Sequence, residues 1–450
     1  MFMKNLVSCV LFAVMAYGSL MAQTERIMPE RCGTMLKLAN DEAYSNGVIV
    51  AEMEAQRYRA FDKQLLNRED EYVIPVVVHV IYHEDFPEQN IPDSLILSQL
   101  AVLNEDFSRT NADAANTRSI FDSIAIDTKI RFEFAQLDPQ GNPTNGITRT
   151  ATQNESFDIF TDGQESMKSS STGGVDAWPT NKYLNLWVCK LTYFGIENAL
   201  LGFAQFPSTM PENEGGNSNS SAATDGVVIN YAHFGRTNDP VTAPNNLGRT
   251  CTHEVGHWLG LRHIWADEQD PFTGDPGNCT QDDFVDDTPI SNQPSSQTCD
   301  LTRNACSNDA DYSNNYWLNN PPDMVENYMD YSSDGCMNMF SKGQTERMLS
   351  FLLTARKELL GDFTSINEQE QKLVKRLFPN PANEVLVVEL NERTQHPEQI
   401  KVYNNLGQLI VNKAIPSGQQ TIRLNTADLE PGNYFLHFSG QSTASRFVIM

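Results

Sequence analysis

The chain has 450 residues, of which 58 are acidic and 32 basic, and its formal net charge is −26. This balance argues against a nucleic-acid-binding protein, which needs a basic face, and against binding to anionic membranes. A hydrophobic fraction of 40% is typical of globular proteins, and the length predicts two or three domains. Eight cysteines allow a few disulfides but are too few for a small scaffold built on them.

The N-terminal residues predict export. Lys4 precedes an apolar run from Leu6 to Tyr17, and small residues follow as far as Ala22. A basic start, about 12 apolar residues and then small residues are typical of a signal peptide, here residues 1–22. An uncleaved membrane anchor is the alternative, but the run is too short to span a bilayer. Since no later stretch reaches transmembrane length, we expect a secreted or cell-surface protein without a transmembrane segment.

A polar leader over residues 23–70 contains a predicted helix over residues 41–64. A globular block over residues 71–360 follows, and it opens with a β-branched, apolar run at 72–82 that is typical of a buried strand. Further strands are expected over 129–137, 183–188 and 226–230, with helices starting at 93 and spanning 247–261. Strands that alternate with helices predict an α/β domain with a mixed sheet.

The rest of the chain changes character twice. Residues 264–340 are rich in acids, Asn, Ser, Pro and Gly, and a loop of this length needs metal ions or disulfides to hold it. A helix over 343–360 is expected to close the block, and residues 361–375 form a polar linker. Residues 376–450 contain short alternating runs separated by turn signals, which predict an all-β sandwich.

The strongest chemical signal is a histidine pattern. His253 and His257 are four residues apart, so a helix places both imidazoles on one face, where they can bind one metal ion. Gly260 allows the helix to stop and the chain to turn, and His263 returns as a third ligand. Three neutral imidazoles with an open fourth position are typical of catalytic zinc, and Glu254 can take a proton from a zinc-bound water. A chance match on a surface helix is the alternative.

This spacing is the metzincin form of the zinc peptidase motif, which is followed by a turn that contains methionine. Glu326-Asn327-Tyr328-Met329-Asp330-Tyr331 fits that turn. With Gly-Arg-Thr-Cys-Thr before His253 and the run from Cys336 to Gln344 after the turn, residues 30–360 resemble the pappalysin family of metzincin zinc peptidases. The resemblance implies an α/β catalytic domain over residues 71–360, with a mixed twisted sheet, an active-site helix and an irregular C-terminal subdomain.

The resemblance also implies roles for single residues. Met329 would form the apolar floor beneath the histidines, and Tyr331 would help to stabilise the tetrahedral transition state. An ordinary core methionine and an ordinary buried tyrosine are the alternatives. Asp334 would lie at the base of the pocket for the residue after the cleaved bond, where a carboxylate pairs with a guanidinium. We therefore expect cleavage before Arg, with Lys second; a solvated turn aspartate is the alternative.

The acidic segment from Gln281 to Pro289 suggests a second metal. Its four carboxylates, with neighbouring carbonyl and hydroxyl oxygens, are the hard donors that suit calcium. The resemblance implies that Asp283, Thr288 and the carbonyl of Val285 bind it. No EF-hand spacing is present, and a solvated acidic loop is the alternative.

The cysteines of the same segment predict disulfides. Four cysteines allow three pairings, and the resemblance favours Cys279 with Cys306 and Cys299 with Cys336. A thiolate metal site is the rival, but no C-x-x-C spacing is present. Whether Cys189 and Cys251 pair or remain buried thiols is left open.

Cys32, in the leader, is a candidate for holding the enzyme inactive. A thiolate is a strong zinc ligand, and one in the open position would displace the water. The resemblance implies such a cysteine switch and hence a latent zymogen, whereas a stray thiol or an intermolecular disulfide is the bland alternative. If the enzyme cuts before Arg, then Arg57, Arg59 and Arg68 are candidate self-processing points.

The terminal module carries a second resemblance. Leu377-Phe378-Pro379-Asn380-Pro381, Val402 to Gln408 and Leu429 to Tyr434 resemble the C-terminal sorting domain of the type IX secretion system. The resemblance implies that residues 376–450 are recognised by that machinery and that a Gram-negative bacterium exports the protein. An adhesive or substrate-binding sandwich is the alternative.

These features together predict a secreted zinc endopeptidase that acts on proteins or peptides. Glu254 would deprotonate the bound water and pass the proton to the leaving amine. Two rivals stay open: a zinc hydrolase that acts on a non-peptide amide, and an adhesion or binding protein with a vestigial zinc site. Glu254 speaks against the second, because a structural zinc site needs no base.

Overall fold

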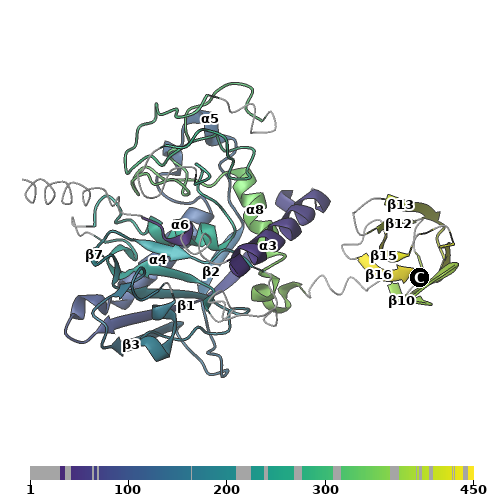
Figure 1. The fold of residues 1–450 in the computed structure, drawn as a ribbon, viewed down its shortest axis with the longest axis horizontal. Helices are drawn as coiled ribbons and strands as arrows, with labels where there is room; N and C mark the ends of the chain where they lie inside the picture. Colours follow the sequence, from purple (N-terminus) through teal and green to yellow (C-terminus); the bar gives the residue numbers. More distant parts are fainter. Residues whose placement is uncertain are drawn as a thin grey trace, which may run out of the picture. The chain divides into compact units, whose positions relative to one another are not determined.

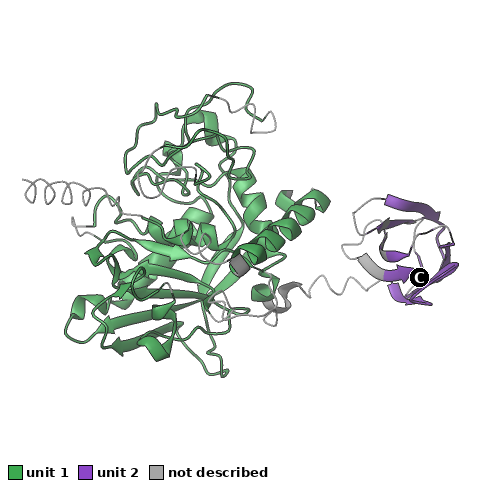
Figure 2. Ribbon diagram, viewed as in Figure 1, with its two compact units in different colours: residues 1–360 green, residues 361–450 purple. Residues whose placement is uncertain are grey.

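The computed structural model describes residues 31–35, 42–62, 65–67, 70–163, 165–208, 224–237, 242–267, 276–307, 316–364, 374–391, 393–394, 398–404, 409–427, 429, 431–438 and 444–449. The chain forms two compact units, Met1–Leu360 and Gly361–Met450, which are described separately (Figure 2). The predicted signal peptide (1–22) and Arg68 lie outside the described residues.

A mixed sheet in the order β2-β1-β5-β9-β8 forms the centre of the first unit, and β3 also pairs with β1 (Figure 1). Its strands are β1 (Tyr72–His83), β2 (Ile130–Phe134), β3 (Ile147–Thr152), β5 (Leu184–Cys189), β8 (Gly202–Ala204) and β9 (Val227–Asn230). Neighbouring strands are parallel except β8, which is antiparallel to β9. β1 pairs with β2 through its first half and with β3 through its second, and its buried run of valines fits this central place.

A smaller sheet, in the order β4-β6-β7, belongs to the same unit. Its strands are β4 (Phe157–Asp158), β6 (Leu191–Tyr193) and β7 (Ile196–Glu197). The prediction found β1, β2, β5 and β9 but not β3, β8 or these short strands. A run of two or three residues has no periodicity to detect, and β3, with the sequence ITRTAT, has few apolar residues to mark it as a strand.

Helices α4 and α6 contact each other as well as the sheet, and α3 lies beside α8 (Figure 1). Among the described residues of the unit, the α-helices are α3 (Glu42–Phe61), α4 (Asp93–Phe107), α5 (Ser119–Asp122), α6 (Arg249–Trp258) and α8 (Lys342–Leu352). Phe107 of α4 and Val255 and Trp258 of α6 are fully buried in the core that these helices share with the sheet. Among the helices that the structure describes, none combines the length and the apolar character needed to cross a membrane.

The closing helix differs from its prediction. α8 begins with a capping box between Ser341 and Gln344, but it ends at Leu352, and a 3₁₀ helix over Lys357–Thr364 follows. The break brings the guanidinium of Arg356 to the carbonyl of Trp258 at 2.8 Å and into an ion pair with Asp225. A tertiary ion pair of this kind leaves no signal in the local sequence. The helical pattern of the sequence therefore continues through the break, and the predicted helix was too long.

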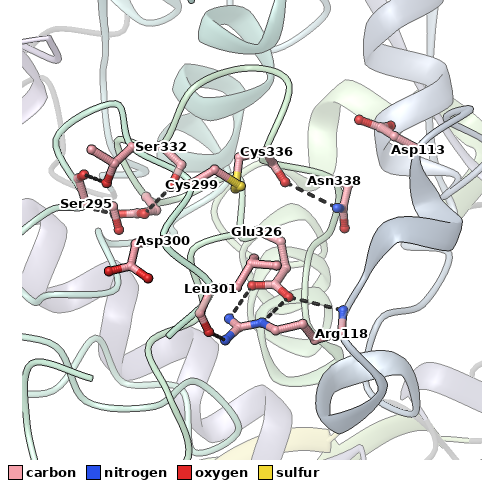
Figure 3. The surroundings of a disulfide bond; sticks show 12 residues. Asp113, Arg118, Ser295, Cys299, Asp300, Leu301, Glu326, Ser332, Cys336 and Asn338 are labelled. Carbon is pink, nitrogen blue, oxygen red and sulfur yellow. Dashed lines mark hydrogen bonds and ion pairs between the residues drawn. A yellow bond between two sulfur atoms is a disulfide. The ribbon is translucent and has the colours of Figure 1, made fainter. Parts of the chain in front are cut away.

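Two disulfides hold the irregular segment after residue 264, Cys279–Cys306 and Cys299–Cys336, and these are the pairs that the resemblance implied. Figure 3 shows how Arg118 ties the surroundings of Cys299–Cys336 together. Its guanidinium donates to the carbonyl of Leu301 at 2.6 Å and to the carboxylate of Glu326, the first residue of the methionine turn. Cys189 and Cys251 are buried free thiols.

The second unit is a β-sandwich of two antiparallel sheets, in the orders β10-β11-β14 and β13-β12-β15-β16. Its strands are β10 (Val374–Phe378), β11 (Val385–Leu390), β12 (Glu398–Asn404), β13 (Leu409–Ile415), β14 (Thr421–Asn425), β15 (Gly432–Phe438) and β16 (Ala444–Ile449). Alternate residues such as Leu386, Val388 and Val402 are buried in its own hydrophobic core. The predicted fold class, an α/β domain followed by a sandwich, is therefore confirmed.

Candidate metal centre

Helix α6 positions the first two histidines. His253 and His257 lie one turn apart on the same face, and both are buried. After the helix ends, Gly260 has a φ of +92°, and a Cβ there would lie 2.2 Å from the ring of Phe351. Only glycine permits this turn, which brings His263 back to the pair.

The three imidazoles direct their Nε2 atoms to one point. Nε2 of His257 lies 3.1 Å from that of His253 and 3.0 Å from that of His263, and the remaining pair is 3.2 Å apart. The opposite nitrogens are held by the carbonyls of Tyr328 and Leu261, both at 2.7 Å, and by the carboxylate of Asp267 at 2.5 Å. A ring whose Nδ1–H donates keeps the lone pair of Nε2 free for a metal.

The donor set fits a zinc ion. A tetrahedral ion with Zn–N bonds of about 2.0–2.1 Å needs nitrogens about 3.3 Å apart, close to the spacing here. The Sγ of Cys32 belongs to the same cluster, whose four ligand atoms all lie within 4.8 Å of one another. Burial lowers the pKa of His253 and of His257 well below the usual value, which favours the neutral rings that a metal requires.

Glu254 lies beside this cluster and is almost fully buried. Its Oε2 accepts hydrogen bonds from Thr34 at 3.1 Å and from the thiol of Cys32 at 3.3 Å. Its Oε1 has no hydrogen-bond partner among the described residues. Burial raises the pKa of Glu254 to about 8, as befits a carboxylate that exchanges protons in an enclosed site.

The leader reaches the site by pairing with the edge strand β8. Cys32 forms a parallel bridge with Gly202, where the N–H of Gly33 donates to the Gly202 carbonyl at 3.0 Å. One residue on, the Thr34 hydroxyl accepts from the N–H of Ala204 at 2.9 Å. A Cβ on Gly202 would lie 3.1 Å from Cγ of Glu254, and this glycine therefore lets the edge strand approach the carboxylate.

The methionine turn lies against α6. Met329 is fully buried, and a Cβ added to Gly256, between the two helical histidines, would lie 2.5 Å from its sulfur. The ring centroid of Tyr331 lies 5.6 Å from that of His253 and 5.0 Å from that of His263. Met329 therefore lies against the histidine helix, and the ring of Tyr331 lies next to two of the histidine rings.

Asp334 is fully buried and therefore not a solvated turn residue. Its Oδ2 accepts from the backbone N–H of Leu247 at 2.8 Å and of Arg249 at 3.4 Å, at the start of α6. Its Oδ1 has no partner among the described residues, and burial raises its pKa. The structure thus gives Asp334 a contact at the start of helix α6. Its place at the base of a substrate pocket stays a prediction.

Sequence reasoning missed a buried polar network behind the histidines. Asp106 of α4 accepts from the hydroxyl of Tyr328 at 2.7 Å and from that of Thr252 at 2.8 Å. Tyr328 supplies the carbonyl that holds His253, and Arg249 pairs with Asp106 from the start of α6. Asp267 and Gly256 were missed as well, although their places close to the motif could have drawn attention to them.

The acidic loop brings the three predicted calcium ligands together. Thr288 Oγ1 lies 2.9 and 3.0 Å from the two carboxylate oxygens of Asp283 and 2.7 Å from the carbonyl of Val285. All three residues are buried. Burial and the charge of Asp282 raise the pKa of Asp283, so a cation there would relieve an unfavourable charge.

The sheet, the histidine helix and the buried methionine turn define a metallopeptidase of the metzincin class. Comparisons agree: residues 168–353 match the peptidase M43 profile, described as pregnancy-associated plasma protein-A, and residues 376–450 match a secretion system C-terminal sorting domain. Mature mirolysin of Tannerella forsythia, solved with a cleaved peptide, is 42% identical over 66% of this chain and 98% of its own, with a TM-score of 0.55.

Fungal proteins are similar too. An extracellular metalloprotease of Arthroderma benhamiae is 31% identical over 61% of this chain and 71% of its own length. One of Pyricularia oryzae is 29% identical over 78% of this chain and 98% of its own. The chain belongs to the pappalysin family of metallopeptidases and carries a type IX sorting domain.

Proposed function

We propose that the protein is a zinc endopeptidase that is made as a latent zymogen. His253, His257 and His263 hold the ion, and Glu254 is the general base. The observation that carries the proposal is the convergence of three Nε2 atoms beside a buried carboxylate that has an oxygen without a partner among the described residues. Zinc bound there supplies an activated water and polarises the scissile carbonyl.

The chain's own residues supply the other steps. Glu254 takes the proton of the attacking water and delivers it to the leaving amine. Tyr331, whose ring lies against those of His253 and His263, stabilises the tetrahedral transition state. Met329 forms the floor beneath the histidine helix.

Latency comes from the leader in this proposal. The thiol of Cys32 occupies the fourth position of the site, and its neighbour Thr34 donates to Glu254. A mutant of promirolysin from Tannerella forsythia is 39% identical over 74% of this chain and 97% of its own, with a TM-score of 0.55. The pro-form aligns with more of the chain than mature mirolysin does, which supports a leader of related structure. Arg57 and Arg59 are in α3, where Arg57 is exposed.

Substrate choice, calcium and export complete the proposal. We propose cleavage before Arg, with Lys second; a buried carboxylate at Asp334, whose Oδ1 has no partner among the described residues, supports this proposal. Asp283, Val285 and Thr288 bind a structural calcium ion, as their converging oxygens suggest. The sorting domain directs export through the type IX machinery of a Gram-negative bacterium.

The test is a cleavage map of a denatured protein mixture, read by mass spectrometry with and without a zinc chelator. After removal of the leader the protein should cut before Arg, and the chelator or Glu254→Ala should lower the rate by at least about 10³-fold. Glu133→Ala, an exposed carboxylate on β2, is the matched control and should leave the rate unchanged. Zinc-dependent hydrolysis of simple amides without protein cleavage would favour the non-peptide hydrolase, and no hydrolysis after leader removal would favour the binding protein.

A further inference from the structure

A leader side chain lines a cavity next to the metal centre. Arg31 immediately precedes Cys32, and the two line one small cavity together with His253, Glu254 and Tyr331. The guanidinium of Arg31 lies 5.4 Å from the centroid of the Tyr331 ring. The wall of this cavity therefore already includes a residue with the chemical group that the proposed substrate would bring.

Three acceptors hold this guanidinium from two directions. One terminal nitrogen donates to the carbonyl of Tyr331 at 2.5 Å and to that of Ser332 at 3.2 Å. The other donates to the side-chain Oδ1 of Asn245 at 2.5 Å. Burial lowers the pKa of Arg31, and the nearby charge of Asp334 works against that effect, which sets the carboxylate close to the guanidinium without a direct ion pair.

Asn245 is built into this position. It is buried, its backbone N–H donates to the carbonyl of Thr242 at 2.9 Å, and its own carbonyl contacts the ring of His233 at 3.0 Å. The following residues lead directly into Leu247, whose N–H binds Asp334. A buried amide fixed in this way is preorganised for a ligand and costs little to order.

We propose that Asn245, with the carbonyls of Tyr331 and Ser332, forms a guanidinium-binding subsite that selects Arg over Lys in substrates and that Arg31 fills in the latent chain. The inference deepens the proposed peptidase function and rests on it. Arg presents separate nitrogens in a planar fork, whereas Lys presents one ammonium. A Lys at the two carbonyls would leave the buried oxygen of Asn245 without a donor.

Chain direction distinguishes the leader from a substrate. The leader's arginine precedes the residue at the metal, whereas the predicted substrate arginine follows the bond that is cut. Both side chains reach one subsite only if leader and substrate cross the site in opposite directions. The parallel pairing of Cys32 with β8 gives the leader's direction.

The first test uses the self-activated full chain and two peptides that differ only in Arg or Lys after the scissile bond. Asn245→Ala should lower kcat/KM for the Arg peptide by about 10-fold or more, mainly through KM, and change the Lys peptide by less than about two-fold. Asn246→Ala, the neighbour on the same loop, is the control and should keep the parent's Arg-to-Lys ratio.

The second test uses the latent chain, in which Arg31→Ala should raise the rate of activation about 10-fold while the mature enzyme's constants stay the same. The activation rate of Arg31→Lys should lie between that of the parent and that of Arg31→Ala. An unchanged Arg-to-Lys ratio in Asn245→Ala, or unchanged activation in Arg31→Ala, would overturn the inference even if the parent prefers Arg. A parent that cuts neither peptide would instead overturn the proposed function.

Discussion

Each of the three histidines is oriented by a partner of its own, two of them backbone carbonyls and one a carboxylate. His253 depends on a carbonyl of the methionine turn, His257 on a carbonyl just beyond its own helix, and His263 on the carboxylate of Asp267. The motif specified the ligands, but the groups that orient them come from separate segments. Such groups fix the tautomer and ring direction of each ligand, so the metal affinity of the site depends on residues outside the motif.

Gly256 shows how closely the methionine turn approaches the histidine helix. We predict that Gly256→Ala destabilises the protein by about 1–3 kcal/mol, because the new methyl group would collide with the sulfur of Met329. Urea unfolding and zinc retention measure the effect. Gly335→Ala is the control, since a Cβ there meets nothing within 4 Å. If contact with the sulfur is the cause, Gly256→Ala should cost much less stability in a Met329→Ala background than in the parent; an equal cost in both backgrounds would contradict the explanation.

His79 of β1 makes stability depend on pH. It is buried between Thr148 and Asn185, and burial lowers its pKa to about 4, below the roughly 6.5 of an unfolded histidine. The unfolded chain thus binds more protons between these values, so the contribution of His79 is complete above about pH 6.5 and falls as the pH drops toward 4. We expect a loss of about 3 kcal/mol over that window.

Urea unfolding between about pH 4 and pH 7 tests this dependence. His79→Gln should flatten the pH profile relative to the parent, because its amide can keep hydrogen bonds without titrating. His83→Gln, at the half-buried end of the same strand, should retain the parent's profile. Parallel profiles for parent and His79→Gln would show that another group is responsible.

At the scale of elements, sequence patterns predicted those strands and helices that depend on local sequence alone. The run of β-branched residues in β1 and the histidine spacing of α6 are local, and both gave the right structure. The path of the leader along β8 and the reach of Asp106 from α4 to the methionine turn were not predictable, since they depend on pairing between segments far apart in sequence. Asp334 was found through a family resemblance, but its contact with the start of α6 was not.

Helix α3 of the leader is held by an ion pair with Arg347, which also contacts the turn at Gly260 between His257 and His263. Both guanidinium ends of Arg347 bind the carboxylate of Glu52, and its Nε donates to the carbonyl of Gly260 at 2.8 Å. We predict that Glu52→Gln speeds activation of the latent chain by about 10-fold, because Arg347 is buried and loses its opposite charge. The measurement is the rate at which activity develops in secreted protein.

The matched control is Glu54→Gln, an exposed position on the same helix, which should activate at the parent's rate. Equal rates for both variants would mean that this ion pair does not contribute to latency. Faster activation in both would point to helix α3 as a whole rather than to Glu52.

At the scale of the molecule, the two compact units have separate hydrophobic cores, and both proposed metal sites belong to the first unit. We predict two calorimetric transitions, because each unit can unfold by itself.

Millimolar calcium should raise the midpoint of only the first unit's transition, by roughly 5 °C, since an ion that binds only the folded loop stabilises it by mass action. Asp283→Asn should abolish that response, whereas Asp300→Asn, an exposed acid of the same segment, should keep it. A calcium response that survives in Asp283→Asn, or that belongs to the sandwich, would contradict the proposed site. Because the zinc ligands are histidines and the calcium ligands oxygens, a zinc chelator should abolish activity in both variants alike.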